Sequence, residues 1–260
     1  MQSASTEHQE TNQSPLYQDK NLLIIYTVSL ITFLVLASIP PAFPKIIQTL
    51  HVPPQKIGLL ISVFSLPSIA LGPVVGLLAD RVGKKKILVP SLILFGIAGT
   101  ACAFARDFNL LLLFLFLQGI GAASLHSLII ALISDLYSGT RRTTAIGYNT
   151  SIINASAAIY SILGGALAVR DWHYPFLLSL AAIPVALLVW FGLKNPDPIC
   201  EKHLKMNLLN ASKSLKNRQL LGLFMVSIAQ FMLIYGAFRT YLPLLIAYSF
   251  KSSSLIIGLI

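Results

Sequence analysis

The sequence predicts an all-α integral membrane protein, and three observations lead to that fold class. Of its 260 residues, 55% are hydrophobic and 11% are charged, whereas soluble domains carry about 25% charged residues. The apolar residues form runs of about 20, which is the length that a helix needs to cross a bilayer. These runs do not alternate between apolar and polar positions, as the strands of a membrane barrel would.

Seven apolar runs and the beginning of an eighth follow one another along the chain. They cover residues 21–41, 56–78, 87–105, 109–133, 144–168, 173–193 and 219–246, with the eighth starting near 254. Residues 1–20 are polar and have no basic segment followed by an apolar one, so we expect a cytoplasmic tail and not a signal peptide. The polar linker 194–218 then separates a six-helix bundle, 21–193, from the start of a second bundle at 219–260.

The distribution of basic residues predicts the orientation. Most of the 19 Lys and Arg residues lie in connections on one side of the membrane if the N-terminus is cytoplasmic, as the positive-inside rule requires. The net charge of +10 is therefore a feature of topology, and we expect no nucleic-acid partner. The prediction is a multi-pass protein of the cell (inner) membrane, with the lipid bilayer as its surroundings.

The second block indicates an internal repeat. The segment PLLIAYSFKSSSLIIGLI at the end of the chain is similar to PKIIQTLHVPPQKIGLLI after the first apolar run, as in a parallel repeat of six-helix halves. The eighth run stops at Ile260, and a helix that ended inside a bilayer would leave carbonyl groups unsatisfied. We therefore expect the sequence to be the front part of a longer protein or a truncated product.

Catalytic and metal-binding patterns are missing from the sequence. It contains no H-E-x-x-H, G-x-S-x-G or P-loop motif. The nine carboxylates lie in tails, loops or helix ends, and the two cysteines, Cys102 and Cys200, form no metal-ligand pattern. We expect neither an enzyme nor a resident cofactor or metal.

One polar stretch between the second and third runs, residues 76–86, reads GLLADRVGKKK. A basic turn would be expected from topology alone, but that does not explain the placement of its glycines and its single carboxylate. The stretch resembles the loop motif G-x-L-a-D-r-x-G-r-k of the major facilitator superfamily. The residues that match and that we predict to act in gating are Gly76, Asp80, Arg81, Gly83, Lys84 and Lys85.

This resemblance implies a twelve-helix transporter fold, of which the chain holds the six-helix N-terminal bundle, helix seven and the start of helix eight. Gly76 is expected to let a neighbouring helix approach, and Gly83 to permit a tight turn. Asp80 is expected to pair with Arg81 or with a helix of the other half, as part of a latch for the outward-facing state. The resemblance also implies a small-molecule substrate, protons as the coupling ion and a monomeric full-length protein.

Two further segments resemble the same family with departures. LFLQGIGAA at 115–123 matches the helix-four motif at Gln118, Gly119, Gly121 and two alanines, but Leu115 replaces the usual arginine that is associated with proton coupling. In helix five, Gly164 and Gly165 match the second half of the antiporter motif G-P-x-x-G-G, while its Gly-Pro is missing. RDWHYPFLL at 170–178 resembles the sixth-helix start of bacterial drug and arabinose-efflux members.

Four residues are candidates for binding substrate or protons. Gln118 lies in the helix-four motif, and His126 is a titratable side chain near the middle of the same run. Asn154 is a predicted buried amide in helix five, and Arg239 in YGAFRTYLP is a candidate for anion or carboxylate binding. Small residues recur down helices two and five and are expected to form packing faces, and Pro40, Pro41 and Pro44 are expected to bend helix one.

Three functions remain open at this point. The first is export of small organic molecules by alternating access, driven by proton antiport. The second is uptake or symport of a small anion or sugar, which the incomplete helix-five motif and Arg239 allow. The third is a non-transporting membrane fragment or assembly component.

Overall fold

The computed structural model describes residues 19–193, 218–250 and 253–259, and within these ranges all regular structure is helical. Six of the described helices are long and apolar enough to cross a membrane, and a bent helix pair makes a seventh such span. The predicted all-α fold is therefore confirmed. The predicted tail 1–20 and linker 194–218 lie almost entirely outside the described residues, so these two boundaries stay predictions.

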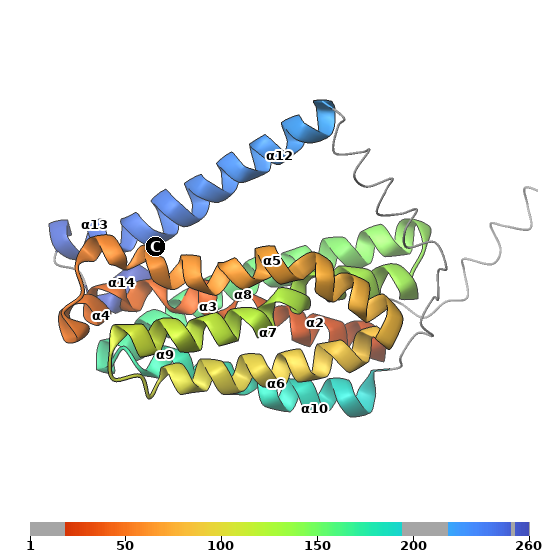
Figure 1. Cartoon of the computed structure of the whole chain (residues 1–260), viewed down its shortest axis with the longest axis horizontal. Coiled ribbons are helices and arrows are strands. Elements are labelled where there is room, and N and C mark those ends of the chain that lie inside the picture. Colours follow the sequence, from red (N-terminus) through yellow and green to blue (C-terminus); the bar gives the residue numbers. More distant parts are fainter. Residues whose placement is uncertain (1–18, 194–217, 251–252, 260) are drawn as a thin grey trace, which may run out of the picture.

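The helices run back and forth along the long axis of the molecule (Figure 1). In chain order they are α2 (Lys20–Thr32), α3 (Leu34–Ser38), η3 (Pro40–Ala42), α4 (Phe43–Leu50), η4 (Pro54–Lys56), α5 (Gly58–Val82), α6 (Lys84–Cys102), α7 (Phe108–Leu136), α8 (Gly139–Arg170), α9 (Tyr174–Leu177), η5 (Leu178–Ala181), α10 (Ala182–Gly192), α12 (Arg218–Phe231), η6 (Met232–Tyr241), α13 (Leu242–Phe250) and α14 (Ser254–Leu259). Each predicted apolar run corresponds to one of these helices or to a consecutive group of them.

The first span is broken. Its two pieces, Lys20–Thr32 and Leu34–Leu50, meet at an angle of 41°. Pro40 and Pro41 form the 3₁₀ turn η3, and Pro44 lies in the first turn of α4. Proline removes the backbone N–H that an α-helix needs at these positions, so the sequence itself accounts for the irregular second half of this span.

The tightest helix contacts lie between α5, α6 and α7. A Cβ atom at Gly119 would stand 2.2 Å from the Phe64 carbonyl oxygen, and one at Gly121 would stand 2.7 Å from the Phe95 nitrogen. Only glycine fits at such backbone contacts, which is how membrane helices pack closely. The central helix α7 is therefore fixed by the glycines of the predicted helix-four motif.

The packing faces predicted for helices two and five were largely wrong. Among the described residues, no atom lies within 4 Å of a Cβ built at Gly72, Gly76 or Gly147. Helix five packs closely near its C-terminal end, where a Cβ at Gly164 would stand 2.2 Å from the Ser38 carbonyl oxygen and one at Gly165, a member of the predicted face, would stand 2.5 Å from that of Ser254. Of the other small residues on these faces, Ser62, Ser151 and Ala158 are exposed, whereas Gly58, Ser65 and Ser161 are half-buried.

The bundle has two ends. We call the end that carries residues 80–86 the motif end, and the end that carries Pro40 and Pro41 the proline end. At the proline end the later helices touch the first bundle, since α13 contacts α4 and α14 contacts η3 and α8. Toward the motif end, α12 diverges from α5 and from the rest of the first bundle (Figure 1).

The surface of the bundle carries large apolar side chains. Ile69 is 78% exposed and Phe191 is 82% exposed, and both lie in helices that are long enough to span a membrane. Contiguous apolar surface of this kind is rare on soluble monomers, and it is what a lipid-facing helix requires.

Candidate functional site

The predicted gating motif forms the turn between α5 and α6. Gly83 adopts φ 105° and ψ 131°, a conformation that L-residues rarely adopt and glycine adopts freely. The turn role predicted for Gly83 is therefore confirmed. The turn brings the next residue, Lys84, back over the end of α5 and toward α7.

The two lysines after Gly83 tie this turn to other helices. The Nζ atom of Lys84 lies 2.5 Å from a carboxylate oxygen of Asp135 at the end of α7, and it also reaches the carbonyl oxygen of Ala131 at 3.4 Å. The Nζ atom of Lys85 donates to the carbonyl oxygen of Leu193, just after α10, at 2.8 Å. The partner Asp135 was not singled out from the sequence, because nothing in the spacing of residues 84 and 135 indicates their proximity.

Asp80 is held only loosely in this arrangement. Its carboxylate lies 3.8 Å from the Nζ atom of Lys84, and its side chain is 54% exposed. Its described partner is Lys84, and no pairing with Arg81 is seen among the described residues; the predicted pairing of Asp80 with a helix of the other half stays a prediction. No described atom lies within 4 Å of a Cβ built at Gly76, so its contact with a neighbouring helix also stays a prediction.

Gln118 lies in a buried helix contact. It is fully buried, and its Nε2 atom donates to the hydroxyl of Ser179 at 3.0 Å. A Cβ at Gly99 of α6 would collide with both side chains, so this polar pair occupies the space that Gly99 leaves. This geometry explains why a glutamine packs well at this point in α7. Gln118 makes a contact between helices and does not share a described contact with His126, Asn154 or Arg239.

His126 and Asn154 are exposed on α7 and α8. The imidazole of His126 makes an edge-to-face contact with the ring of Phe33, at 6.2 Å between ring centres, beside the break in the first span. The prediction that Asn154 is a buried amide was wrong. The buried amide of α8 is Asn149, whose side chain accepts a hydrogen bond from the buried hydroxyl of Ser29 in α2.

Arg239 reaches across to the first span from η6. The segment η6 is π-helical and ends at Tyr241, two residues before Pro243; such wide turns are uncommon and occur often at functional sites. The Nη1 atom of Arg239 donates to the carbonyl oxygen of Leu36 at 2.7 Å. In an α-helix this carbonyl would accept from the N–H of residue 40, which is a proline and has none.

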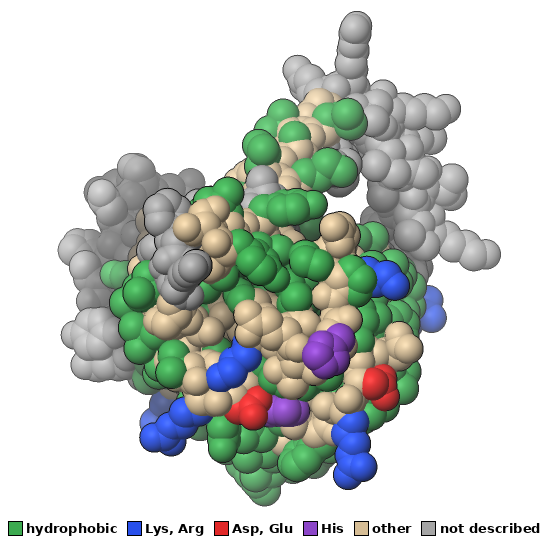
Figure 2. Space-filling model, turned by 90° about the vertical axis from the view of Figure 1, so that its left-hand side faces the viewer, with side chains coloured by type: hydrophobic (Ala, Val, Ile, Leu, Met, Phe, Trp, Pro, Cys, Tyr) green, Lys and Arg blue, Asp and Glu red, His purple; other side chains and the backbone are tan. Residues whose placement is uncertain are grey.

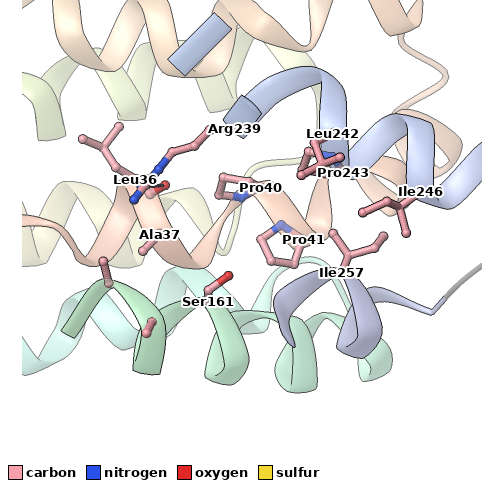
Figure 3. A pocket seen from close by; sticks show the side chains of 12 residues that line it. Leu36, Ala37, Pro40, Pro41, Ser161, Arg239, Leu242, Pro243, Ile246 and Ile257 are labelled. Atoms are coloured by element: carbon pink, nitrogen blue, oxygen red, sulfur yellow. Dashed lines mark hydrogen bonds between the residues drawn. The ribbon is translucent and has the colours of Figure 1, made fainter. Parts of the chain in front are cut away.

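A cavity of about 200 Å³ lies beside this contact, between the first span, α8, α13 and α14. Figure 3 shows Arg239 extending toward Leu36, with Pro40, Pro41 and Ser161 on the opposite wall. The lining side chains are mostly apolar, and they bring together Leu36, Ala37, Pro40, Pro41, Ala157, Ala158, Ser161, Arg239, Leu242, Pro243, Ile246 and Ile257. Of the four predicted binding residues, Arg239 lines this cavity.

The proline end has a second cation that binds helix carbonyls. The Nζ atom of Lys45 in α4 donates to the carbonyl oxygens of Ala168, Val169 and Arg170 at 3.1, 2.8 and 2.9 Å. These are the last residues of α8, whose carbonyls have no helical partner and attract positive charge. This contact could not be predicted from the sequence, because it joins residues more than one hundred positions apart.

Next to this contact the loop between α8 and α9 carries an acid–histidine pair. The carboxylate of Asp171 lies 2.7 Å from Nδ1 of His173, and Trp172 is buried between them and the bundle. Burial alone would raise the pKa of Asp171, but hydrogen bonds from His173 and its charge hold that pKa below its ordinary value. Figure 2, which faces the proline end, shows acidic, basic and histidine side chains gathered among hydrophobic ones.

The described residues contain no group of three or more His, Cys, Asp or Glu side chains that could hold a metal ion. Basic side chains make two kinds of contact in this part of the molecule. At the motif end a lysine contacts carboxylates, and at the proline end a lysine and an arginine contact backbone carbonyls. Neither arrangement offers a nucleophile with a neighbouring base.

Comparison with known families gives the same fold. The family model described as "Major Facilitator Superfamily" matches residues 25–260. The chain belongs to this family. The resemblance seen in residues 76–86 and 115–123 is thereby confirmed, and the chain is a multi-pass membrane protein.

Two curated bacterial relatives are exporters or resistance proteins by name. The Bacillibactin exporter of Bacillus subtilis (strain 168) is 33% identical over 164 residues, which cover 60% of this chain and 41% of the relative. The "Quinolone resistance protein NorA" of Staphylococcus aureus is 28% identical over 161 residues, or 62% of this chain and 42% of the relative. The matched segment thus spans less than half the length of these relatives.

Solved transporter structures share the fold. A bacterial homologue of the human lysosomal transporter Spinster, in an inward-facing and unoccupied conformation, has a TM-score of 0.81 at 20% identity, covering 95% of this chain and 59% of that one. A D-xylose–proton symporter has a TM-score of 0.70 at 15% identity, with 92% and 64% covered. At these identities the likeness concerns the fold alone.

Proposed function

We propose that the chain belongs to a secondary active transporter that exports small organic molecules by alternating access and is driven by proton antiport. The observation that carries the proposal is the difference between the two ends. The helices of the second block touch the first bundle at the proline end, while α12 diverges from it at the motif end. A transporter caught open to one side has this shape.

The open side is assigned to the cytoplasm by charge. The motif end carries a dense group of basic residues, among them Arg81, residues 84–86, Arg141 and Arg142. Positive residues collect on the cytoplasmic side of membrane proteins, so the conformation is inward-facing and the N-terminus is cytoplasmic. Export is supported further by the names of the two bacterial relatives.

The motif residues are proposed to act as a latch that is released in this state. Asp80 and Arg81 are exposed and stand where a returning second-block helix would meet them. Lys84 keeps the turn attached to α7 through Asp135, so the turn stays in place when the latch opens. The latch then forms when the cytoplasmic side closes, which stabilises the outward-facing state.

Proton coupling is proposed to involve His126. Its imidazole contacts the ring of Phe33, which lies at the break in the first span. Histidine titrates close to neutral pH in the absence of perturbation, and an ionisable side chain within a membrane helix is a functional candidate. The arginine usual in this helix is replaced by Leu115, so coupling would need another group such as this one.

The experiment is transport by the 260-residue chain in proteoliposomes, with a fluorescent quinolone as the probe and an imposed pH gradient. The prediction is extrusion that collapses when the gradient is dissipated and that is impaired in Asp80→Asn. The exposed surface residue Arg142, changed to Gln, is the matched control and should transport normally.

Extrusion that continues without a gradient would contradict the coupling proposal. Movement of the quinolone in the direction of uptake would favour the alternative function, which Arg239 allows. If a chain that is inserted and folded moves no probe in either direction, the transport proposal itself fails.

A further inference from the structure

The end of α7 holds the gating turn in place. The Nζ atom of Lys84 lies 2.5 Å from the Asp135 carboxylate and 3.4 Å from the carbonyl oxygen of Ala131, both near the end of α7. Asp135 is the next-to-last residue of this helix. A contact that fixes the last turn of α7 therefore also fixes the point to which the turn between α5 and α6 is attached.

Tyr137, which directly follows α7, is fixed by contacts from two other parts of the chain. Its side chain is buried, and its hydroxyl donates to a carboxylate oxygen of Asp19 at 2.5 Å. The guanidinium of Arg141 in α8 lies 6.0 Å from the centre of its ring. Burial and the hydrogen bond to Asp19 both raise the pKa of Tyr137, so the hydroxyl keeps the proton that it donates.

Asp19 divides its two carboxylate oxygens between two helices. Its Oδ1 atom accepts from the backbone N–H of Asn21 at 3.0 Å and so caps the N-terminus of α2, whereas Oδ2 accepts from Tyr137. The helix α2 is itself attached to α8, because the hydroxyl of Tyr26 donates to the carbonyl oxygen of Ala145 at 3.2 Å. Capping needs only one oxygen, and the second joins this supported helix to the end of α7.

We propose that Asp19 and Tyr137 are positioning residues for the gating motif, and that their hydrogen bond keeps the turn at Gly83 where the latch can form. The inference rests on the proposed transport function, to which it adds a link between the start of the first span and the latch. The link runs from Asp19 through Tyr137 and the last turn of α7 to Asp135 and Lys84.

The effect on the latch follows from preorganisation. Asp80 and Arg81 are exposed at the end of α5, directly before this turn. A group that is already held in its binding position loses less conformational entropy when it makes a contact. Loss of the Asp19–Tyr137 bond should therefore weaken the latched, outward-facing state more than the inward-facing state, in which the latch is open.

Two variants remove the link and keep its surroundings. Tyr137→Phe removes only the hydroxyl. Asp19→Asn keeps an oxygen for the cap of α2, where asparagine serves about as well as aspartate, and replaces the acceptor for Tyr137 by an NH₂ group. Because both variants remove the same hydrogen bond, the double variant should behave like either single one.

The first measurement is a spin-label distance between Val82, beside the turn, and Ser151 of α8, which are both exposed. It uses the purified 260-residue chain with Cys102 and Cys200 replaced by serine. The distance distribution is expected to be broader in Tyr137→Phe and in Asp19→Asn than in the wild type.

The matched control is Tyr148→Phe, which removes an exposed hydroxyl near the motif end of α8 and should leave the distribution unchanged. Distributions of wild-type width in both test variants, or a double variant that is broader than either single one, would overturn the proposal. If Tyr137→Phe does not fold, as judged by thermal unfolding, Asp19→Asn decides.

The second measurement is quinolone transport in proteoliposomes. Turnover is expected to fall about three- to tenfold in either variant, because a half-buried hydrogen bond changes an equilibrium by roughly this factor. The KM for the quinolone should not rise, since the link lies at the latch and not at the substrate. Unchanged turnover, or a raised KM, would overturn the positioning role. A wild type that moves no quinolone contradicts the transport function alone, because the distance measurement needs no transport.

Discussion

The two ends of the bundle are both held by basic side chains, but the partners of these side chains differ. At the motif end Lys84 meets two carboxylates, those of Asp135 and Asp80. At the proline end Lys45 and Arg239 meet backbone carbonyls. The first kind of contact joins opposite charges, and the second joins a cation to a neutral acceptor.

This difference indicates what can disrupt the helix contacts at each end. The half-exposed Asp80 makes a weak ion pair with Lys84, of the kind that contributes about 0–1 kcal/mol and exchanges readily with water, which suits a latch that opens and closes. The contacts of Arg239 with Leu36 and of Lys45 with Ala168 are part-buried, and each joins a cation to a neutral acceptor on another helix. The motif end is therefore the end that we propose to respond to movement of the second block.

The largest expected effect is a difference in stability between substitutions in the two halves of α8. Gly164→Ala would place a methyl group 2.2 Å from the Ser38 carbonyl oxygen at the proline end, and such overpacking costs about 1–3 kcal/mol. Gly147→Ala, toward the motif end of the same helix, meets nothing within 4 Å among the described residues and should be neutral or slightly stabilising. Thermal unfolding in detergent measures both, and equal melting temperatures would contradict the packing difference.

The next effect concerns Lys45, which caps the C-terminal end of α8. Lys45→Met keeps the length of the side chain but removes three hydrogen bonds to the carbonyls of residues 168–170. The expected loss is about 1–2 kcal/mol in the free energy of unfolding, since each hydrogen bond is worth about 1 kcal/mol and water replaces part of the set. Lys56→Met, at an exposed position of the same end, is the control. An unchanged stability in Lys45→Met would show that the contact contributes nothing.

A smaller effect distinguishes the two carboxylates at the motif end. Asp135→Asn removes the closer partner of Lys84, which is mostly buried, whereas Asp80→Asn removes a distant and half-exposed one. Asp135→Asn should therefore lower the melting temperature more than Asp80→Asn does. In transport the order should reverse, because Asp80 is the proposed latch residue. Identical ranks in both assays would contradict the separation of the two roles.

The smallest effect is a pH dependence at the proline end. The pKa of Asp171 is lower in the folded protein than its ordinary value, so its pair with His173 stabilises the fold above the ordinary carboxyl range and is lost as the pH falls below about 4. The melting temperature of Asp171→Asn should consequently fall less between pH 6 and pH 3 than that of the wild type. Parallel pH profiles would contradict this contribution.

The spans were predictable because each depends on local composition. Each run expected from hydropathy corresponds to a helix or to a consecutive group of helices in the structure, and the turn at Gly83 follows from the motif that contains it. The irregular second half of the first span also follows from its prolines. These features need only the residues of one segment and the properties of the bilayer.

The contacts between segments were not predictable in the same way. Asn149, and not Asn154, is the buried amide of α8 because Ser29 of α2 lies opposite it, and only the packing of two helices decides which face is covered. The link from Arg239 to Leu36 spans more than two hundred residues. It combines a local cause, the missing N–H of Pro40, with a distant one, the π-helical turn before Pro243.

The central claim is that the proposed transporter closes one end when it opens the other. Spin-label distances test it most directly, with one pair at Thr49 and Ser249 of the proline end and another at Val82 and Gly222 of the motif end. These four positions are exposed, and Cys102 and Cys200 are replaced by serine. Added quinolone should lengthen the first distance and shorten the second. Two distances that change in the same direction, or that do not change at saturating quinolone, would contradict the account.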